Sequence, residues 1–187
     1  MLSSQQQTIR RILRVNHAGE HGAIAIYERQ IRMSRHYPDL LPWLQETLGH
    51  EKQHRGRFRA LMPNRLAKPC RAMAVWNTGG ALLGLLTAAF GRFGVIVCTA
   101  AVERTVHRHL VEQIRYLADR DRELAETIRD IQREEDAHLA FAEANHDPQS
   151  IPARLLGAFV AIATEILILI STRGDSTKLR NQLGAAH

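Results

Sequence analysis

The sequence predicts an all-α protein: a four-helix bundle with two additional apolar helical segments. Ala, Leu, Arg and Glu dominate the composition, β-branched runs are scarce, and only 5% of residues are aromatic, which favours helix over strand. A pattern of acids and histidines also recurs in the two halves of the chain, at a spacing that suits facing helices. The 187 residues are enough for one domain with a sizeable core, so we interpret 1–187 as a single domain.

The first two helices are predicted from apolar residues that recur every three or four positions. The first helix runs from about Gln5 to His36, and the second ends at Met62-Pro63-Asn64. Polar residues complete both stripes, so they point where core residues belong. The stripes are Ile9, Ile12, Leu13, Asn16, Glu20, Ala23, Ile24, Tyr27 and Ile31 in the first helix, and Leu44, Leu48, Glu51, His54, Phe58 and Leu61 in the second.

A strongly apolar run follows from Met73 to Val102, with Arg92 as its only charge. Glycines interrupt this run, and a split at Gly91-Arg92 leaves pieces too short to span a bilayer as one helix. One interpretation is a buried core helix followed by the start of the next bundle helix. The other is an apolar element, at about 73–95, that faces an apolar ligand or lies on a membrane interface. The residues alone leave both interpretations open.

Three further helices are predicted in the second half of the chain. They are a helix with an apolar stripe from Ile96 to Leu117, a helix from about Asp121 to Asn145, and a last helix from Pro152 through Ile170. The last helix is apolar nearly all round. We therefore expect the segment at about 153–171 to be buried or interfacial rather than transmembrane.

Two Glu-x-x-His motifs, Glu51–His54 and Glu135–His138, indicate the chemistry of the protein. Residues three apart share a helix face, so each motif aims a carboxylate and an imidazole at one point. A further glutamate precedes each motif at a nearly equal distance: Glu20 precedes the first motif, and Glu103 precedes the second. One Glu from each of two helices, with a Glu-x-x-His from each of the other two, is the arrangement of di-iron and di-manganese carboxylate bundles. The six candidate ligands are Glu20, Glu51, His54, Glu103, Glu135 and His138.

Six ionisable groups in one core need a common partner. Burying an unpaired carboxylate costs several kcal/mol or shifts its pKa until the group is neutral. Two divalent cations satisfy four carboxylates and two imidazoles almost neutrally, with two of the carboxylates bridging. Oxygen-rich ligands with one histidine per metal suit iron or manganese better than zinc. The alternative is a set of buried ion pairs with arginine, but no arginine falls on the stripes beside these residues.

The remaining polar residues have less specific interpretations. Four histidines lie within a turn or two of the upstream glutamates and are candidates to support the ligands: His17, His21, His107 and His109. We expect surface positions for His36, His50, His146 and His187, and solvated helix charges at Glu28, Glu112, Glu134 and Glu143. Glu165, in the apolar last helix, is expected to pair with an arginine of a neighbouring helix.

The net charge of +6 at pH 7 indicates either attraction to an anionic membrane surface or a simple bias of composition. The basic residues are mostly arginines spread over every helix without a basic run, so a nucleic-acid groove is disfavoured. Cys70 and Cys98 lack the spacing of a zinc site or a disulfide framework. The N-terminus is free of acids, as transit peptides are, but it continues directly into the first helix. We therefore expect a cytoplasmic compartment.

These motifs resemble the demethoxyubiquinone hydroxylases of ubiquinone biosynthesis over about Ile9 to Arg173. The stretches that carry the resemblance are Arg14-Val15-Asn16-His17-Ala18-Gly19-Glu20 with Gly22-Ala23, His50-Glu51-Lys52-Gln53-His54, Cys98-Thr99-Ala100-Ala101-Val102-Glu103, Gln113-Ile114-Arg115 and Glu134-Glu135-Asp136-Ala137-His138. Two residues depart from the family pattern: Arg104, where many members have a second acid, and Leu110, where some members have a tyrosine. Neither departure removes a candidate ligand.

The resemblance implies a ferritin-like bundle with a centre of two iron ions, which inserts one oxygen atom of O₂ into the ring of a polyprenyl benzoquinol. The implied ligands are the six residues above, with no catalytic residue separate from them. The resemblance also implies peripheral attachment to the membrane that holds the quinone, on the cytoplasmic side of the inner or cell membrane. It is compatible with a homo-oligomer or a ubiquinone-biosynthesis complex.

The chain needs electrons from outside. No stretch has the strand and the glycine spacing of a dinucleotide fold. NADH or a partner reductase is therefore the expected source, acting directly or through the quinone.

Two other functions fit parts of the sequence. A ferritin-like iron-oxidising or iron-storage protein would use the same ligands without an organic substrate, although a soluble cage subunit would gain nothing from the apolar segments. A purely structural helical bundle on a membrane would tolerate alanine at Glu51 or Glu135 without losing metal.

Overall fold

The computed structural model describes residues 3–172 and 181, and in these residues all regular secondary structure is helical. The helices are α1 (Ser4–Met33), α2 (Leu41–Leu61), α3 (Met73–Ala88), α4 (Gly91–Leu117), α5 (Arg122–Ala144) and α6 (Ile151–Thr172), with a 3-10 turn, η1 (Pro63–Arg65), after α2. The all-α prediction is therefore confirmed for the described part of the chain. That 1–187 forms a single domain stays a prediction.

Local signals in the sequence account for where two of the bundle helices begin. At the start of α1, the Ser3 hydroxyl accepts a hydrogen bond from the Gln6 backbone N–H, and the Ser3 backbone N–H donates to the Gln6 side chain. Asp121 caps α5 by accepting a hydrogen bond from the backbone N–H of Leu124. Compared with the predictions, α1 ends slightly earlier and α6 is longer at both ends.

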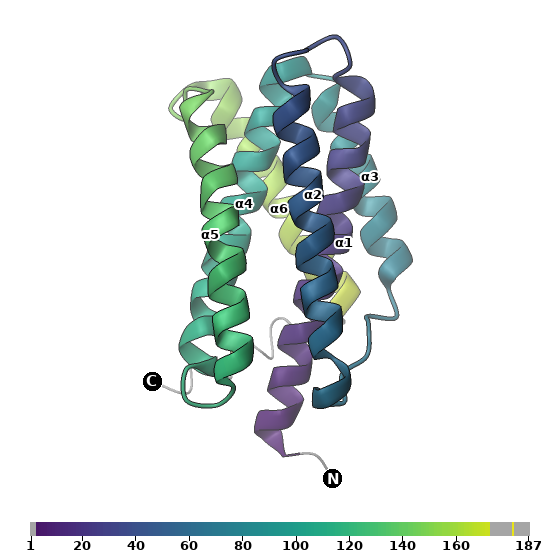
Figure 1. The fold of residues 1–187 in the computed structure, drawn as a ribbon. Coiled ribbons are helices and arrows are strands. Elements are labelled where there is room, and N and C mark those ends of the chain that lie inside the picture. Colours follow the sequence, from purple (N-terminus) through teal and green to yellow (C-terminus); the bar gives the residue numbers. More distant parts are fainter. Residues whose placement is uncertain (1–2, 173–180, 182–187) are drawn as a thin grey trace.

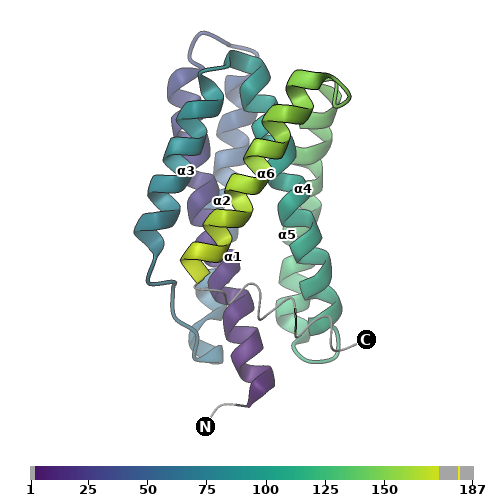
Figure 2. The ribbon, with the colours of Figure 1, turned by 180° about the vertical axis from the view of Figure 1, so that it is seen from behind.

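Helices α1, α2, α4 and α5 form the four-helix bundle (Figure 1). Within it, α1 packs on α2 and α4 packs on α5. Seen from behind, α6 runs obliquely between α3 and α4, on the side of the bundle away from α2 and α5 (Figure 2). Because α3 packs on α1 while α6 packs on α4, the two additional apolar helices together cover one side of the bundle.

Two apolar clusters fill the bundle, one on each side of its middle. One cluster, around the N-terminal part of α1, includes Ile12, Leu13, Phe58, Leu117, Leu124, Ile128 and Ile131, all fully buried. The other includes Tyr27, Leu40, Leu44, Val95, Ile96 and Ala100. Along each bundle helix the acids of the repeated pattern fall between these two clusters. The acids therefore occupy the middle of the bundle.

Glycines allow α3 to lie very close to α1. A Cβ atom on Gly80 would lie 2.3 Å from the backbone oxygen of Gly22, and one on Gly84 would lie 2.5 Å from that of Ile26. Real Cβ atoms essentially never approach so closely, so only glycine fits there without a shift of the backbone. This close packing brings α3 side chains against the middle of α1.

Both covering helices keep one apolar face exposed. On α3, Leu82 is 55% exposed, and on α6, Ile151 and Leu155 are 70% and 69% exposed. The opposite faces are buried against the bundle, so the segment from Met73 is neither a fully buried core helix nor a free interfacial one. By length and composition alone, 151–170 of α6 could also cross a membrane.

Candidate metal centre

Each of the four bundle helices places acid or histidine side chains in the middle of the core. The contributions are Glu20 from α1, Glu51 and His54 from α2, Glu103 from α4, and Glu135 and His138 from α5. All six side chains are buried, the most accessible being Glu20 at 7%. The structure therefore brings together every residue that the repeated motif predicted.

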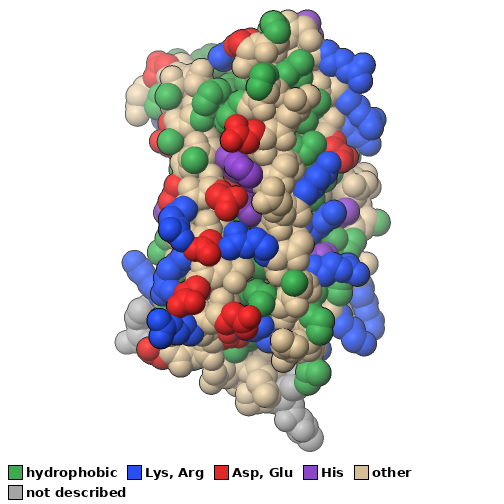
Figure 3. All heavy atoms as spheres, in the orientation of Figure 1, with side chains coloured by type: hydrophobic (Ala, Val, Ile, Leu, Met, Phe, Trp, Pro, Cys, Tyr) green, Lys and Arg blue, Asp and Glu red, His purple; other side chains and the backbone are tan. Residues whose placement is uncertain are grey.

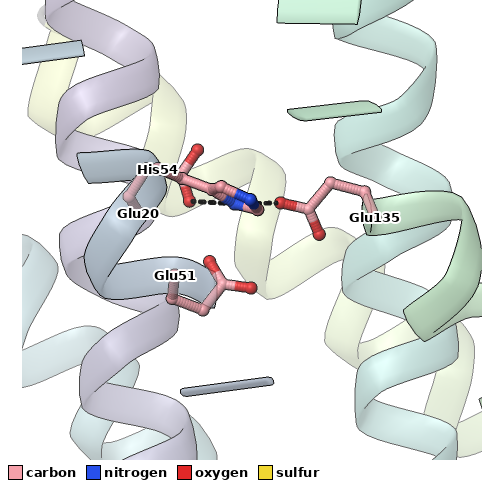
Figure 4. A group of neighbouring side chains, drawn as sticks. All are labelled: Glu20, Glu51, His54 and Glu135. Atoms are coloured by element: carbon pink, nitrogen blue, oxygen red, sulfur yellow. Dashed lines mark ion pairs between the residues drawn. The ribbon is translucent and has the colours of Figure 1, made fainter. Parts of the chain in front are cut away.

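The six residues form two overlapping groups. Glu20, Glu51, His54 and Glu135 each offer a ligand atom within 4.8 Å of the others, and so do Glu51, Glu103, Glu135 and His138. Glu51 and Glu135 belong to both groups. Figure 4 shows the first group, in which side chains from α1 and α2 point across the bundle toward Glu135.

Both histidines turn Nδ1 toward the carboxylates. His54 Nδ1 lies 3.0 Å from Glu135 Oε1 and 3.9 Å from Glu20 Oε2. His138 Nδ1 lies 3.2 Å from Glu135 Oε2 and 3.8 Å from Glu51 Oε1. Each imidazole thus presents one nitrogen to the centre and leaves Nε2 for a partner outside it.

The pKa values reflect the crowding of the carboxylates. Burial and the charge of Glu135 raise the pKa of Glu20 to about 7. Burial and the same neighbour also raise the pKa values of Glu51 and Glu103 well above their ordinary range. Burial would raise the pKa of Glu135 too, but contacts with both histidines hold it below its ordinary range. Burial lowers the pKa of His54, yet the nearby carboxylates raise it to about 9.

This set of groups fits divalent cations. Carboxylates and imidazoles are the ligands that iron and manganese prefer, and two dications would balance four negative charges. Glu51 Oε1 is buried and has no hydrogen-bond partner among the described residues, as befits an atom that binds an ion. In the described structure these carboxylates pair with histidines and a tyrosine, so the alternative of buried arginine pairs is not supported.

Two residues contact the outer nitrogens of the site histidines. Glu134 Oε2 lies 2.9 Å from His54 Nε2, and His50 Nδ1 lies 2.9 Å from His138 Nε2. A partner of this kind fixes the orientation and the tautomer of a metal-binding imidazole. The expectation that His50 and Glu134 are merely solvated surface residues is therefore wrong.

The repeated motif itself contained the signal for these two residues. His50 and Glu134 occupy the same place in the two repeats, one residue before the motif glutamate and four before the motif histidine. On a helix this places them at the edge of the site face, where each reaches the histidine of the facing helix. In Figure 3, histidine and acidic side chains meet in the middle of the α2–α5 face.

A tyrosine also supports the site. The Tyr27 hydroxyl, on α1, donates a hydrogen bond of 2.9 Å to Glu103 Oε1. The sequence placed Tyr27 only in an apolar stripe, so this role was missed. The two departures from the family pattern leave the six site residues in place. Leu110 belongs to an apolar cluster and lines the same cavity as the carboxylates, whereas Arg104 pairs with Glu143 at 2.8 Å.

The other histidines have different partners. Three of the four candidates for ligand support pair elsewhere: His21 with Arg55, His107 with Asp136, and His109 with Glu165. His17 is buried, and burial together with the charges of two arginines lowers its pKa to about 4. Glu165 also lies 3.9 Å from Arg108, which confirms its predicted arginine partner. His36 is exposed and His146 is half-buried, while His187 lies outside the described residues.

A small cavity joins the acid cluster to the covering helices. It has a volume of about 90 Å³, and Glu20, Glu51, Glu103 and Glu135 form part of its lining. The rest of the lining comes from α1, α3, α4 and α6, and most of it is apolar. A larger open groove of about 980 Å³ between α4 and α6 contains none of the six site residues, so contact with the acids rather than size identifies the relevant cavity.

Comparison with known proteins agrees with this arrangement. Residues 7–171 match the family described as Ubiquinone biosynthesis protein COQ7. The chain is 33% identical over 173 residues to the mitochondrial NADPH-dependent 3-demethoxyubiquinone 3-hydroxylase of Dictyostelium discoideum, covering 90% of this chain and 79% of that protein. It is 34% identical over 168 residues to the human protein of the same name, covering 87% and 76%. It is 32% identical over 165 residues to the 3-demethoxyubiquinol 3-hydroxylase of Rhodospirillum rubrum, covering 88% and 78%.

Proposed function

The chain belongs to the Ubiquinone biosynthesis protein COQ7 family, and we propose that it is an O₂-dependent di-iron monooxygenase that hydroxylates a polyprenyl demethoxyubiquinol. In this reaction one oxygen atom of O₂ replaces a ring hydrogen as a hydroxyl group, and the other leaves as water. Two electrons and two protons complete the balance. The compared relatives carry names for this hydroxylation, on demethoxyubiquinone or demethoxyubiquinol.

The observation that carries this proposal is the cavity between the acid cluster and the covering helices. An iron-storage protein has to admit a hydrated cation, which favours a polar route. Here the lining is mostly apolar beyond the carboxylates, and it includes side chains of α3 and α6, whose outer faces are exposed. An apolar quinol ring with a long prenyl tail suits such a route.

The six residues would hold two iron ions. Glu20, Glu51, His54 and Glu135 would hold one ion, and Glu51, Glu103, Glu135 and His138 would hold the other. Bound iron supplies the O₂ chemistry that no amino-acid side chain offers. The chain holds the histidines in place through their outer nitrogens and holds Glu103 through Tyr27.

The covering helices bind the substrate and exclude water. Trp76 and Leu83 of α3 and Leu167 and Ile168 of α6 line the cavity. At about 90 Å³ the cavity is smaller than the roughly 300–1,000 Å³ of typical ligand pockets. We infer that α3 or α6 shifts outward when the ring enters, and that the tail leaves between these two helices.

The same helices provide the membrane contact. Their exposed apolar residues form a surface of the kind that meets a lipid interface. We place the protein on the cytoplasmic side of the inner or cell membrane, with α6 lying in the interface because its inner face is held by α4. Electrons come from NADH or a partner reductase, directly or through the quinone. The word NADPH-dependent in the names of two relatives supports a nicotinamide source.

Iron content and quinol hydroxylation, measured on the same sample, test the proposal. The full chain in detergent is reconstituted anaerobically with iron and exposed to O₂, with and without a demethoxyubiquinol. Glu135→Ala should lose iron and product. Glu126→Ala, an exposed position on the same helix, is the matched control and should keep both.

The outcomes separate the candidate functions. Two irons per chain with a hydroxylated quinol support the hydroxylase. Two irons with O₂ consumed and the quinol untouched would favour the iron-oxidising function instead. Unchanged iron content in Glu135→Ala would favour a purely structural bundle.

A further inference from the structure

Two residues that line the cavity carry buried hydrogen-bond donors without a partner in the described part of the chain. Trp76 Nε1 and Thr164 Oγ1 are buried and have no hydrogen-bond partner among the described residues. The two side chains are only 3% and 8% exposed, so bulk water does not solvate them. Both residues form part of the cavity lining. Neither group donates a hydrogen bond to the described residues of the acid cluster.

The two donors come from the two covering helices and lie near each other. Trp76, on the buried face of α3, packs in one apolar cluster with Ile168 of α6. Thr164 precedes Ile168 by one helical turn, on the same inner face of α6. The indole also approaches the acid side, because a Cβ on Gly22, two residues after Glu20, would lie 2.8 Å from Trp76 Cε3. The two residues therefore flank the route from the covering helices to the carboxylates.

Three other polar side chains in the lining are already paired. The side-chain amides of Asn16 and Gln113 bond to each other in both directions, at 2.7 and 3.0 Å. His109 Nε2 lies 3.3 Å from Glu165 Oε1. These pairs leave Trp76 and Thr164 as the buried donors ready to bond to a molecule that enters, while Glu112, which also lines the cavity, is partly exposed to solvent.

We propose that Trp76 and Thr164 donate hydrogen bonds to the ring oxygens of the quinol and so orient the ring beside the acid cluster. This inference rests on the proposed function. A buried donor without an acceptor is costly, and a ligand oxygen recovers that cost. An indole N–H can only donate, so Trp76 selects an acceptor atom on the ligand. A quinol ring carries such oxygens along its edge and the prenyl tail carries none, so the donors place the ring, and not the tail, at the carboxylates.

The test measures binding by the fluorescence of Trp76. The chain has 2 tryptophans, so Trp43→Phe leaves Trp76 as the single emitter in the full-length protein. A demethoxyubiquinone with a short prenyl tail, an efficient quencher, is titrated into this protein in detergent. In the same background, Thr164→Val should raise the Kd about fivefold to tenfold, the loss expected for one neutral hydrogen bond.

Thr47→Val is the matched control. Thr47 is a fully buried threonine of α2 whose hydroxyl also has no partner among the described residues, and it is not part of the described cavity lining. Both valine variants should raise the Tm of the ligand-free protein, because each removes an unpaired buried hydroxyl. Only Thr164→Val should lose affinity, and iron content should stay unchanged in both.

A second variant addresses the indole. Trp76→Phe removes the N–H while keeping an aromatic ring, and it should raise the KM for hydroxylation without changing iron content. The inference is overturned if Thr164→Val binds the quinone with the Kd of the Thr47→Val control and Trp76→Phe hydroxylates the quinol with the wild-type KM. A wild-type protein that holds two irons yet neither binds nor hydroxylates the quinol would instead refute the proposed function.

Discussion

Glu20 should make the metal-free protein less stable as the pH rises. Burial and the charge of Glu135 raise its pKa from an ordinary 4.5 to about 7, so the folded protein holds this proton more tightly than the unfolded chain does. The stabilising contribution is complete below about pH 4.5 and is lost as the pH rises through about 7. At about 1.4 kcal/mol per pKa unit, this shift corresponds to about 3 kcal/mol.

The perturbation is Glu20→Gln in chelator-treated protein. Glutamine keeps the size of the side chain but does not titrate, so the variant should exceed the wild type in stability by about 3 kcal/mol at pH 8 and by about 1 kcal/mol or less at pH 5. Urea unfolding followed by circular dichroism at both pH values measures the difference. Glu126→Gln, at an exposed position on α5, is the control and should change little at either pH.

An equal stability difference at both pH values would refute this reasoning, because it would mean that Glu20 does not titrate in a crowded buried cluster. Iron should reverse the order of stability. Metal binds the deprotonated carboxylate, so the loaded wild type should be more stable than loaded Glu20→Gln. The same pair of proteins thus tests both the electrostatic cost of burying the Glu20 carboxylate and the role of this carboxylate in binding iron.

Three further changes test other contacts. Glu134→Gln should weaken iron binding about tenfold or more, because it loosens the site histidine of α2, and a chelator competition titration measures the loss. Gly80→Ala should lower the free energy of unfolding by about 2 kcal/mol in a urea titration, because the new Cβ meets the α1 backbone. Gly56 has open space around it, so Gly56→Ala should be neutral or stabilising in the same titration. Leu155→Glu, on the exposed face of α6, should reduce sedimentation with lipid vesicles while iron content stays unchanged.

Each of these changes can fail in a specific way. An unchanged chelator midpoint would show that Glu134 does not hold the histidine. Equal stability of the two alanine variants would contradict the close approach of α3 to α1. Unchanged vesicle binding would move the membrane contact away from α6.

The spacing of residues along the chain was enough to predict the helices and the six site residues. Residues three or four apart share a face of any helix, so Glu51 and His54 had to point the same way, as did Glu135 and His138. Each apolar stripe contains an acid, so the sequence predicted that this acid points toward the core. Prolines then marked the end of the second helix, at Met62-Pro63-Asn64, and the start of the last one, at Pro152.

The contacts between helices were decided only by the tertiary structure. His50 of α2 contacts His138 of α5, and Glu134 of α5 contacts His54 of α2. Trp76 and Thr164 meet the same cavity from helices far apart in the sequence. Periodicity reports how a residue is rotated about the axis of its own helix. A contact between helices depends also on their axial offset and crossing angle, which the packing of whole surfaces sets and no single stripe contains.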